Sequence, residues 1–395
     1  MKTAAKVSQP RLAIDGGDKA VQGLGSFPTK IGKDQLLEIL SMWQLGPRTQ
    51  QKLRKLIEDE PDVQGPHLFR YYNPGPSKVA TAEEAMRRLI GVEHCLAVNS
   101  CTSALVASYR ALGIGAGDEV IVPAYTFFAA SATVASSNAI PVIEDVAQAA
   151  GGSFGGKRLG SIGTLGCFSF DYYKIVVSGE GGFVTTDDEW LYTRAQSWHD
   201  CAACWRPDRF AKERKEGELF CGENYRMSEL EGAVALAQIR KTDEMLAGYR
   251  RAKKQIKDAI ERLPGLSFRR LTDEAGDTGI CLVMFLPTAD QMRKAIEAMQ
   301  AEGVPVGGIY DSKIRDWHVY NYWEHILDKK SVARDGLPWS AVPAAEMPNY
   351  SRDMCPRTLD LLSRAVMLDV NWNYSARDCS AIALGINKVL WTILK

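Results

Sequence analysis

The most chemically informative residue of the sequence is Lys174, which lies between the mostly apolar stretch 167–173 and the glycine-rich segment Ser178–Gly182. A lysine amine in such a position can hold an aldehyde as a Schiff base. A carboxylate upstream, Asp145 in the segment Val142–Gln148, could keep a pyridine nitrogen protonated. A pyridoxal phosphate enzyme needs this pair of groups. The first hypothesis is therefore an enzyme whose chemistry comes largely from that cofactor.

A second set of residues could bind the phosphate of such a cofactor. The segment Ser100–Ser103 opens a predicted helix directly after a predicted strand, which brings free N–H groups, hydroxyls and the positive helix end together. An ordinary helix cap explains the same residues, because serine and threonine are common capping types. Ser169 precedes Lys174 by five residues and could offer a second hydroxyl to the same phosphate.

The carboxylate of Asp145 follows an apolar strand, where a buried charge is costly unless it meets a cation. A protonated pyridine nitrogen would be such a cation, and a helix-capping aspartate explains the spacing equally well. The neighbouring Glu144 must point to the opposite face of the strand, so only one of the two can meet the ring. Phe127 could stack on that ring or simply fill volume in the core.

The bulk composition excludes several classes of partner. Lys plus Arg and Asp plus Glu both total 48, so the net charge is zero and no broad field attracts nucleic acid. No run of about 18 apolar residues occurs, so we expect no membrane partner and a soluble, cytoplasmic protein. The nine scattered cysteines do not form a disulfide framework. Cys201 and Cys204, with His199 nearby, lack the remaining ligands of a zinc site, so no metal is expected.

Strand and helix patterns alternate from Cys95 onward. Strands are predicted at Leu96–Val98 and Glu119–Val122, and a helix is predicted at Thr126–Ser136. Such alternation predicts an α/β fold with a mostly parallel sheet covered by helices on both faces. Ligands of such sheets gather at the carboxyl ends of the strands.

A chain of 395 residues suits a large and a smaller domain. A single long helix is predicted from Met227 toward Leu263, and we place the domain change along it, near Tyr249. The predicted organisation is an N-terminal arm with leading helices at Asp34–Leu45 and Thr49–Glu58 (residues 1–80), a large cofactor-binding domain (residues 81–249) and a small α+β domain (residues 250–395).

Six motifs occur in an order that resembles one family. They are Ser100-Cys101-Thr102-Ser103-Ala104-Leu105, Gly117-Asp118-Glu119-Val120-Ile121-Val122-Pro123, Glu144-Asp145-Val146-Ala147-Gln148, Phe168-Ser169-Phe170 with Lys174, Gly179-Glu180-Gly181-Gly182 and Asn224-Tyr225-Arg226-Met227. In combination they resemble the sugar aminotransferases of the DegT/DnrJ/EryC1/StrS family, which are pyridoxal phosphate enzymes of fold type I. The resemblance covers most of the chain, from roughly residue 75 to its end.

The resemblance implies roles around the cofactor ring. By it, Lys174 is the lysine that carries the cofactor, and Asp145 pairs with the pyridine nitrogen. Gln148 would lie against the cofactor, and Phe127 would stack on its ring.

The resemblance also implies a phosphate site and a partner subunit. Thr102, Ser103 and Ser169 would bind the phosphate, and Cys101 belongs to the same cofactor-binding segment. Asn224 resembles the residue that this family extends across a dimer to the partner's phosphate. A homodimer with shared active sites is therefore expected.

One departure from the family pattern lies before the aspartate motif. In the family, the strand near Ile140–Val142 is followed by several tens of residues, including another strand and helix. Here Val142 runs directly into Ile143. The sheet is therefore expected to be a strand or two short.

The implied reaction moves an amino group from glutamate or glutamine to a keto or aldehyde sugar, with Lys174 as general base and acid. The acceptor stays open between a nucleotide sugar, an inosose cyclitol and a sugar-acid aldehyde of the 8-amino-octulosonate type. The segments Asp311–Lys313, Trp317–His318 and Trp323–His325 faintly resemble that last branch.

Two other functions remain open from the sequence. A dehydratase branch of the family has histidine where Lys174 stands, so Lys174 favours amination. A relative that binds the cofactor or a sugar as a sensing ligand, without catalysis, is the second alternative.

Overall fold

The computed structural model of the chain describes residues 13–15, 18–19, 30–61, 67–68, 75–115, 118–135, 143–204, 209–311 and 315–395. The chain divides into two compact units, Met1–Gly75 and Pro76–Lys395. In the first unit, helix α1 (Lys33–Ser41) packs against helix α2 (Pro47–Asp59), and both lie where leading helices were predicted.

The second unit contains a four-stranded sheet in the order β1-β6-β5-β2. Its strands are β1 (His94–Val98), β6 (Gly182–Thr186), β5 (Leu165–Ser169) and β2 (Ile143–Asp145). β6 is antiparallel to both β1 and β5, and β2 is parallel to β5. Three of these four strands therefore run in one direction, as expected, and β6 is reversed between two of them. The reversal follows from the short connection 170–181, which returns the chain along β5 as a hairpin does.

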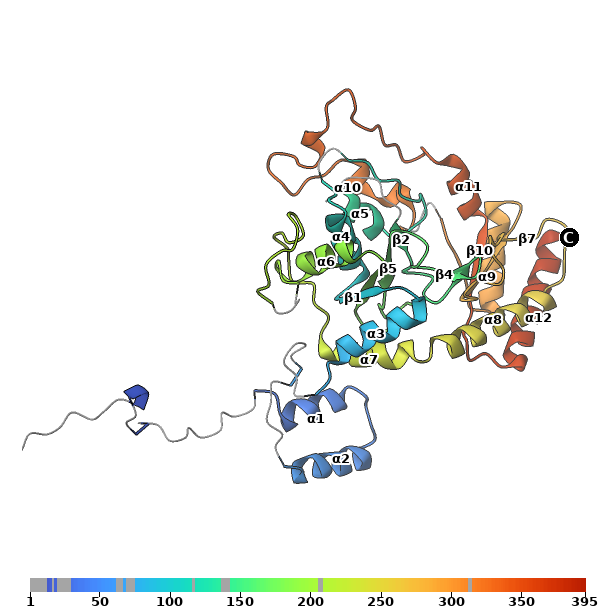
Figure 1. The fold of residues 1–395 in the computed structure, drawn as a ribbon. Helices are drawn as coiled ribbons and strands as arrows, with labels where there is room; N and C mark the ends of the chain where they lie inside the picture. Colours follow the sequence, from blue (N-terminus) through green and yellow to red (C-terminus); the bar gives the residue numbers. More distant parts are fainter. Residues whose placement is uncertain are drawn as a thin grey trace, which may run out of the picture. The chain divides into compact units, whose positions relative to one another are not determined.

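Helices cover both faces of this sheet, as predicted (Figure 1). Successive strand residues point to opposite faces: Cys95 and Ala97 pack in one core cluster, whereas Leu96 and Val98 pack in another. The first cluster lies under α3 (Lys78–Ile90) and α7 (Glu229–Ile239), and the second lies under α4 (Cys101–Ala111) and α6 (Glu189–His199). All residues of β5 and β6 are buried, because helices cover both faces of the sheet.

The long helix predicted from Met227 is interrupted. α7 ends at Ile239, and α8 (Thr242–Ala259) begins after Arg240 and Lys241. The two helices follow one another with only Arg240 and Lys241 between them, so the sequence pattern predicts a single helix. Tyr249 on α8 packs against both the cluster under α3 and a separate cluster of the C-terminal region, so α8 joins two cores.

The C-terminal region forms a second sheet in the order β7-β8-β10-β9, in which all pairs are antiparallel. Its strands are β7 (Ser267–Phe268), β8 (Cys281–Phe285), β10 (Ala365–Asp369) and β9 (Val306–Gly308). The helices α8, α9 (Ala289–Ala301) and α12 (Ala376–Leu394) pack with it. The remaining elements are α5 (Ala129–Ala135), α10 (Glu324–Leu327), α11 (Pro356–Ser363), β3 (Ser153–Phe154), β4 (Lys157–Arg158), η1 (Ala13–Asp15), η2 (Tyr320–Tyr322) and η3 (Trp339–Ala341).

The prediction of a strand at Glu119–Val122 was wrong. The described residues 118–123 form no strand, and Ile121 is 91% exposed. A β-prone segment becomes a strand only when a neighbour accepts its hydrogen bonds, and β2 is the last described strand on its side of the sheet. The predicted junction at Ile140–Val142 lies outside the described residues.

Candidate active site

The loops that follow β1, β2 and β5 meet at one edge of the first sheet. Val98, the last residue of β1, and Ser169, the last residue of β5, both pair with Gly182 at the start of β6. Ser100 forms a parallel bridge with Gly181. Because β2 runs parallel to β5, Asp145 also ends its strand toward this edge. The carboxyl edge is thus built from segments far apart in the sequence.

Lys174 lies in the loop that joins β5 to β6. The loop is closed by hydrogen bonds from the Phe170 N–H to the Gly181 carbonyl (2.9 Å) and from the Ser178 N–H to the Phe170 carbonyl (2.7 Å). The Lys174 N–H donates to the Asp171 carbonyl (3.0 Å), which forms a turn. Among the described residues, the half-buried Lys174 amine has no hydrogen-bond or ion-pair partner. The turn thus fixes the backbone of Lys174, while its side-chain amine is unpaired among the described residues.

The Asp145 carboxylate interacts with the Lys174 amine through space. Although the side chain is accessible, surrounding protein raises the pKa of Asp145, while a hydrogen bond from the Ala147 N–H (3.0 Å) and the charge of Lys174 lower that pKa. Burial also raises the pKa of the Cys101 thiol well above its usual value, Asp145 and Cys167 raise it further, and Lys174 lowers it. Lys174, Asp145 and Cys101 therefore share one neighbourhood, as the sequence predicted.

Glu144, the neighbour of Asp145, has a purely structural set of partners. Its carboxylate accepts hydrogen bonds from the N–H groups of Gly160 (2.8 Å), Ile162 (2.7 Å) and Gly163 (2.6 Å). The two side chains thus have different surroundings, and Asp145 is the one that lies near the lysine.

The start of α4 presents some free groups and some that are already bonded. The Ser100 hydroxyl accepts a hydrogen bond from the Ser103 N–H (3.0 Å), and the Ser103 hydroxyl donates to Asn99 Oδ1 (2.6 Å). Ser103 is buried, so its side chain holds the turn together. Thr102 is exposed, and its hydroxyl has no partner among the described residues. The free donors at this helix start are the Thr102 hydroxyl and the N–H groups of Cys101 and Thr102.

Two further predicted residues lie beside this edge. Ser169 is 5% exposed, and its hydroxyl oxygen is 3.4 Å from the Asp171 N–H. Gln148 lies in the turn after β2, where its side chain is exposed and makes no hydrogen bond with described residues.

Phe127 lies directly before α5, and its ring is 48% exposed. The ring packs against His318, with 5.3 Å between ring centres. His318 in turn contacts Asp316, since its Nδ1 is 2.7 Å from Asp316 Oδ1. The sequence motifs predict no site role for His318 or Asp316. An Asp-x-His spacing was the available signal, but it is too common to stand out alone.

Asn224 lies in the segment that returns from α6 to α7. The Asn99 N–H donates to the Tyr225 carbonyl (2.8 Å), so this segment borders the start of α4. Asn224 is exposed, and its backbone bridges to Asp200. The fully buried Asp200 carboxylate accepts hydrogen bonds from Arg226 and Arg209.

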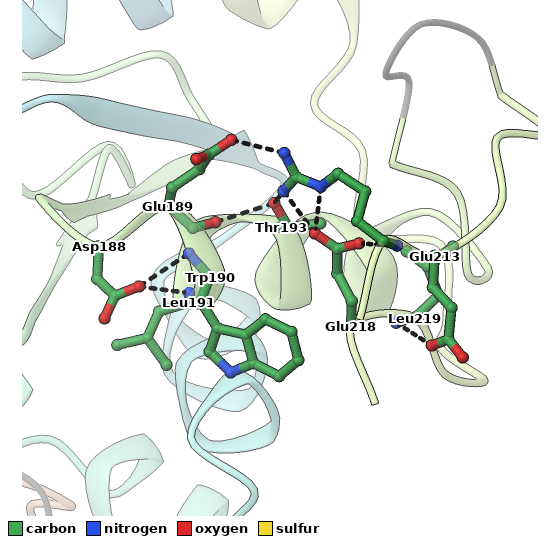
Figure 2. Close-up of polar contacts among 9 residues, drawn as sticks. Asp188, Glu189, Trp190, Leu191, Thr193, Glu213, Glu218 and Leu219 are labelled. Atoms are coloured by element: carbon green, nitrogen blue, oxygen red, sulfur yellow. Dashed lines mark hydrogen bonds and ion pairs between the residues drawn. The ribbon is translucent and has the colours of Figure 1, made fainter. Parts of the chain in front are cut away.

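An ion-pair network anchors the same segment to α6 (Figure 2). The buried Glu218 carboxylate accepts from Arg214 Nε (2.8 Å), and Arg214 Nη1 donates to Glu189 (2.9 Å). Asp188 caps α6 by accepting from the N–H groups of the first turn. The network fixes one end of the segment that carries Asn224.

Comparison with known proteins identifies the family. Residues 71–142 and 132–334 match the DegT/DnrJ/EryC1/StrS aminotransferase family, which together is more than half of the chain. The chain belongs to the DegT/DnrJ/EryC1/StrS aminotransferase family. The two matches overlap over residues 132–142, where the sequence predicts a missing strand and helix.

Curated DegT/DnrJ/EryC1/StrS relatives have names that refer to sugars and cyclitols. GDP-perosamine synthase of Caulobacter vibrioides is 30% identical over 234 residues, which is 46% of this chain and 61% of the relative. L-glutamine:2-deoxy-scyllo-inosose aminotransferase of Streptomyces kanamyceticus is 29% identical over 312 residues, or 61% of this chain and 72% of the relative. The chain thus spans less than two thirds of the first relative and somewhat more of the second.

Solved structures show the same fold. The X-ray structure of the aminotransferase from Psychrobacter cryohalolentis has a TM-score of 0.64, with 20% identity over 81% of this chain and 92% of that one. The fold type I architecture that the DegT/DnrJ/EryC1/StrS resemblance implied is therefore confirmed.

Two kinds of feature are absent from the described residues. No helix there is long and apolar enough to cross a membrane. No group of histidine, cysteine and acidic residues there could hold a metal ion, and His199 near Cys204 is bonded through Nδ1 to the Gln196 carbonyl (2.7 Å).

Proposed function

We propose that this DegT/DnrJ/EryC1/StrS family member is a pyridoxal phosphate-dependent aminotransferase that moves an amino group from glutamate or glutamine to a carbonyl sugar. One observation carries the proposal: Lys174 has no hydrogen-bond or ion-pair partner among the described residues and follows β5, while Asp145 ends β2, which runs parallel to β5 and ends at the same edge of the sheet. A free amine beside a carboxylate is the pair that pyridoxal phosphate needs.

The residues at the carboxyl edge of the sheet carry the types of chemical group that bind pyridoxal phosphate. The amine of Lys174 can bond the aldehyde, and Asp145 keeps one carboxylate oxygen without a hydrogen bond from described residues. The Thr102 hydroxyl and the free N–H groups of α4 suit a phosphate, because the helix end adds positive potential. Ser103 supports this turn through Asn99 rather than offering a free hydroxyl. Cys101, Gln148, Phe127 and Ser169 complete the proposed cofactor-binding set.

The chain's own residues carry the proton transfers. When bound, pyridoxal phosphate supplies an aldehyde and a ring that takes up negative charge. Lys174 would hold the cofactor, and its amine, once displaced by the donor amine, would take the proton from the donor's α-carbon as a base and return a proton as an acid. Asp145 would keep the ring nitrogen protonated, which would favour electron uptake by the ring.

The acceptor is proposed as a keto or aldehyde sugar or a cyclitol. Support comes from the names of the relatives, which include a perosamine synthase and an inosose aminotransferase. The donor is proposed as glutamine or glutamate on the same ground, since one relative is named for L-glutamine.

We also propose a homodimer in which Asn224 reaches the partner's phosphate site. Support comes from the exposure of Asn224, which lies in the segment 209–226 that the ion pairs of Arg214 anchor. The domain boundary is proposed near Tyr249, because this residue packs against two separate cores.

The test is a single turnover with the amino donor alone. The purified protein, loaded with pyridoxal phosphate, is mixed with L-glutamate or L-glutamine, and pyridoxamine phosphate and the keto acid are quantified. One keto acid per bound cofactor supports the proposal. A protein that keeps its cofactor yet forms no keto acid from either donor contradicts it and favours the sensor alternative. Lys174→Ala should be inactive, and Lys157→Ala, an exposed lysine in β4, is the matched control.

A further inference from the structure

The backbone around His318 is fixed to the segment that carries Phe127. Residues Tyr125 and Val319 form an antiparallel bridge. The Thr126 N–H donates to the His318 carbonyl (2.9 Å), and the Tyr320 N–H donates to the Ala124 carbonyl (3.1 Å). The position of His318 relative to Phe127 is therefore set by main-chain bonds on both sides.

The imidazole of His318 is oriented by Asp316. Asp316 Oδ1 lies 2.7 Å from His318 Nδ1 and also accepts from the His318 N–H (2.9 Å). Since a carboxylate oxygen can only accept, the Nδ1 atom must carry the hydrogen. The neutral ring then has its lone pair on Nε2. The charge of Asp316 also contributes to raising the pKa of Tyr125 to about 12, after burial as the largest cause, which places this carboxylate near Tyr125.

The Nε2 atom of His318 is an available acceptor. It has no hydrogen-bond partner among the described residues, and the side chain is 37% exposed. The ring also lies against Phe127, which is 48% exposed and is the proposed stacking partner of the cofactor ring. The orientation of the His318 ring is fixed, and its Nε2 atom is unpaired among the described residues. A substrate that approaches the Phe127 ring could therefore place a polar group against this nitrogen.

We propose that His318 Nε2 accepts a hydrogen bond from a hydroxyl group of the carbonyl acceptor, and that Asp316 is the positioning residue that sets this nitrogen. The inference rests on the proposed function and names the acceptor class: carbonyl compounds that carry hydroxyl groups. A site with a buried or oriented acceptor discriminates strongly against analogues that lack the hydroxyl.

The test separates the two halves of the reaction. The holoenzyme is converted to its amine form with L-glutamate, the donor is removed, and D-glyceraldehyde or propanal is added at equal concentration. These probes have the same three-carbon aldehyde and differ in hydroxyl groups. We expect the enzyme to react about 10-fold or more faster with glyceraldehyde, the effect of about one hydrogen bond.

The variant His318→Phe keeps a ring against Phe127 and removes both nitrogens. It should lose the glyceraldehyde preference, with the propanal rate and the donor half-reaction unchanged. His318→Gln should recover part of the preference, because its amide can reach the Nε2 position. His94→Phe is the matched control, since His94 stacks on Tyr192 at the start of β1.

The variant Asp316→Asn tests whether Asp316 sets the tautomer of the His318 ring. The measurement is one that a purely structural role of Asp316 would leave unchanged. The ¹⁵N spectrum of the His318 imidazole should show hydrogen on Nδ1 in the parent and a shift toward hydrogen on Nε2 in the variant. The KM for glyceraldehyde should rise with little change for propanal.

Several outcomes would overturn the inference. The parent could react at equal rates with glyceraldehyde and propanal. In His318→Phe, the rates with both aldehydes could fall equally, or the preference for glyceraldehyde could stay unchanged. A parent that keeps its cofactor yet forms no amine form with either L-glutamate or L-glutamine would instead overturn the proposed function, on which the inference depends.

Discussion

Glu144 and Asp145 are adjacent carboxylates at the end of β2 that serve different partners. Glu144 accepts three N–H groups of the loop 160–163, whereas Asp145 accepts one N–H and lies within electrostatic range of Lys174. Alternation along a strand separates them, so one carboxylate can hold the fold while its neighbour is available for chemistry.

The pair gives a matched comparison of function against stability. Asp145→Asn should lower turnover by about 100-fold or more, the range for loss of one preorganised electrostatic contact, and should not lower the free energy of unfolding. Glu144→Gln should lower the unfolding free energy by about 1–3 kcal/mol through weaker bonds to the loop, with turnover per folded molecule retained. Turnover and urea unfolding measure the two effects. Equal activity losses in both variants would contradict the assignment of Asp145.

The pH dependence of the cofactor-free protein provides a second test. The pKa of Asp145 in the folded protein is raised above its ordinary value of 3.8, mainly because the surrounding protein desolvates the carboxylate. Between the ordinary pKa and the raised pKa of the folded state, the folded protein binds the proton and the unfolded chain does not, so this residue makes the protein less stable as the pH rises through that window. Asp145→Asn removes the effect. Without cofactor, the variant should be more stable than the parent at neutral pH, and the difference should vanish as the pH falls toward the ordinary value. A difference that grows on acidification would contradict this account.

A substitution at Gly182 tests the close contact of β6 with β5 and with the start of α4. A Cβ atom there would lie 2.6 Å from the Phe168 carbonyl oxygen and 2.7 Å from the Ser100 carbonyl oxygen. Gly182→Ala should therefore cost about 1–3 kcal/mol of stability, as overpacking does, and should weaken cofactor binding because the start of α4 must shift. Gly307→Ala in β9 is the control, because a Cβ there meets open space. Thermal unfolding and cofactor titration provide the readouts, and identical behaviour of both variants would refute the proposed strain.

The proposed shared site can be tested by mixing two inactive proteins. Lys174→Ala and Asn224→Ala homodimers each lack one contribution to every site. If Asn224 acts in the partner's site, a mixed dimer contains one doubly altered and one intact site. An equal mixture should then recover up to about a quarter of the parent activity after subunit exchange, from the symmetry of the dimer. No recovery despite exchange, seen by native mass spectrometry, would place Asn224 in its own subunit's site.

The sequence predicted the neighbourhood of Lys174 and Asp145 well. Asp145 ends β2 and Lys174 follows the buried strand β5, and the carboxyl ends of parallel strands meet at one edge of a sheet. Local sequence therefore carried enough information to bring together residues from β2 and the β5–β6 loop.

Other features depended on partners that local sequence does not reveal. The segment Glu119–Val122 has strand-type residues, yet forms no strand and pairs with no neighbouring strand among the described residues. The reversed direction of β6 depends on the hairpin-like return 170–181 rather than on its own residues. The His318–Phe127 contact joins segments about two hundred residues apart through a main-chain bridge, which no periodicity predicts.

The central claim is that Lys174 bonds the cofactor, and mass spectrometry tests it directly. The protein is loaded with pyridoxal phosphate, reduced with borohydride, digested, and the modified peptide is sequenced. If Lys174 bonds the cofactor, a single adduct is expected on Lys174. The adduct should be present in Lys157→Ala and lost in Lys174→Ala, together with the visible absorbance band. An adduct on a different lysine, or a band that persists in Lys174→Ala, would contradict it.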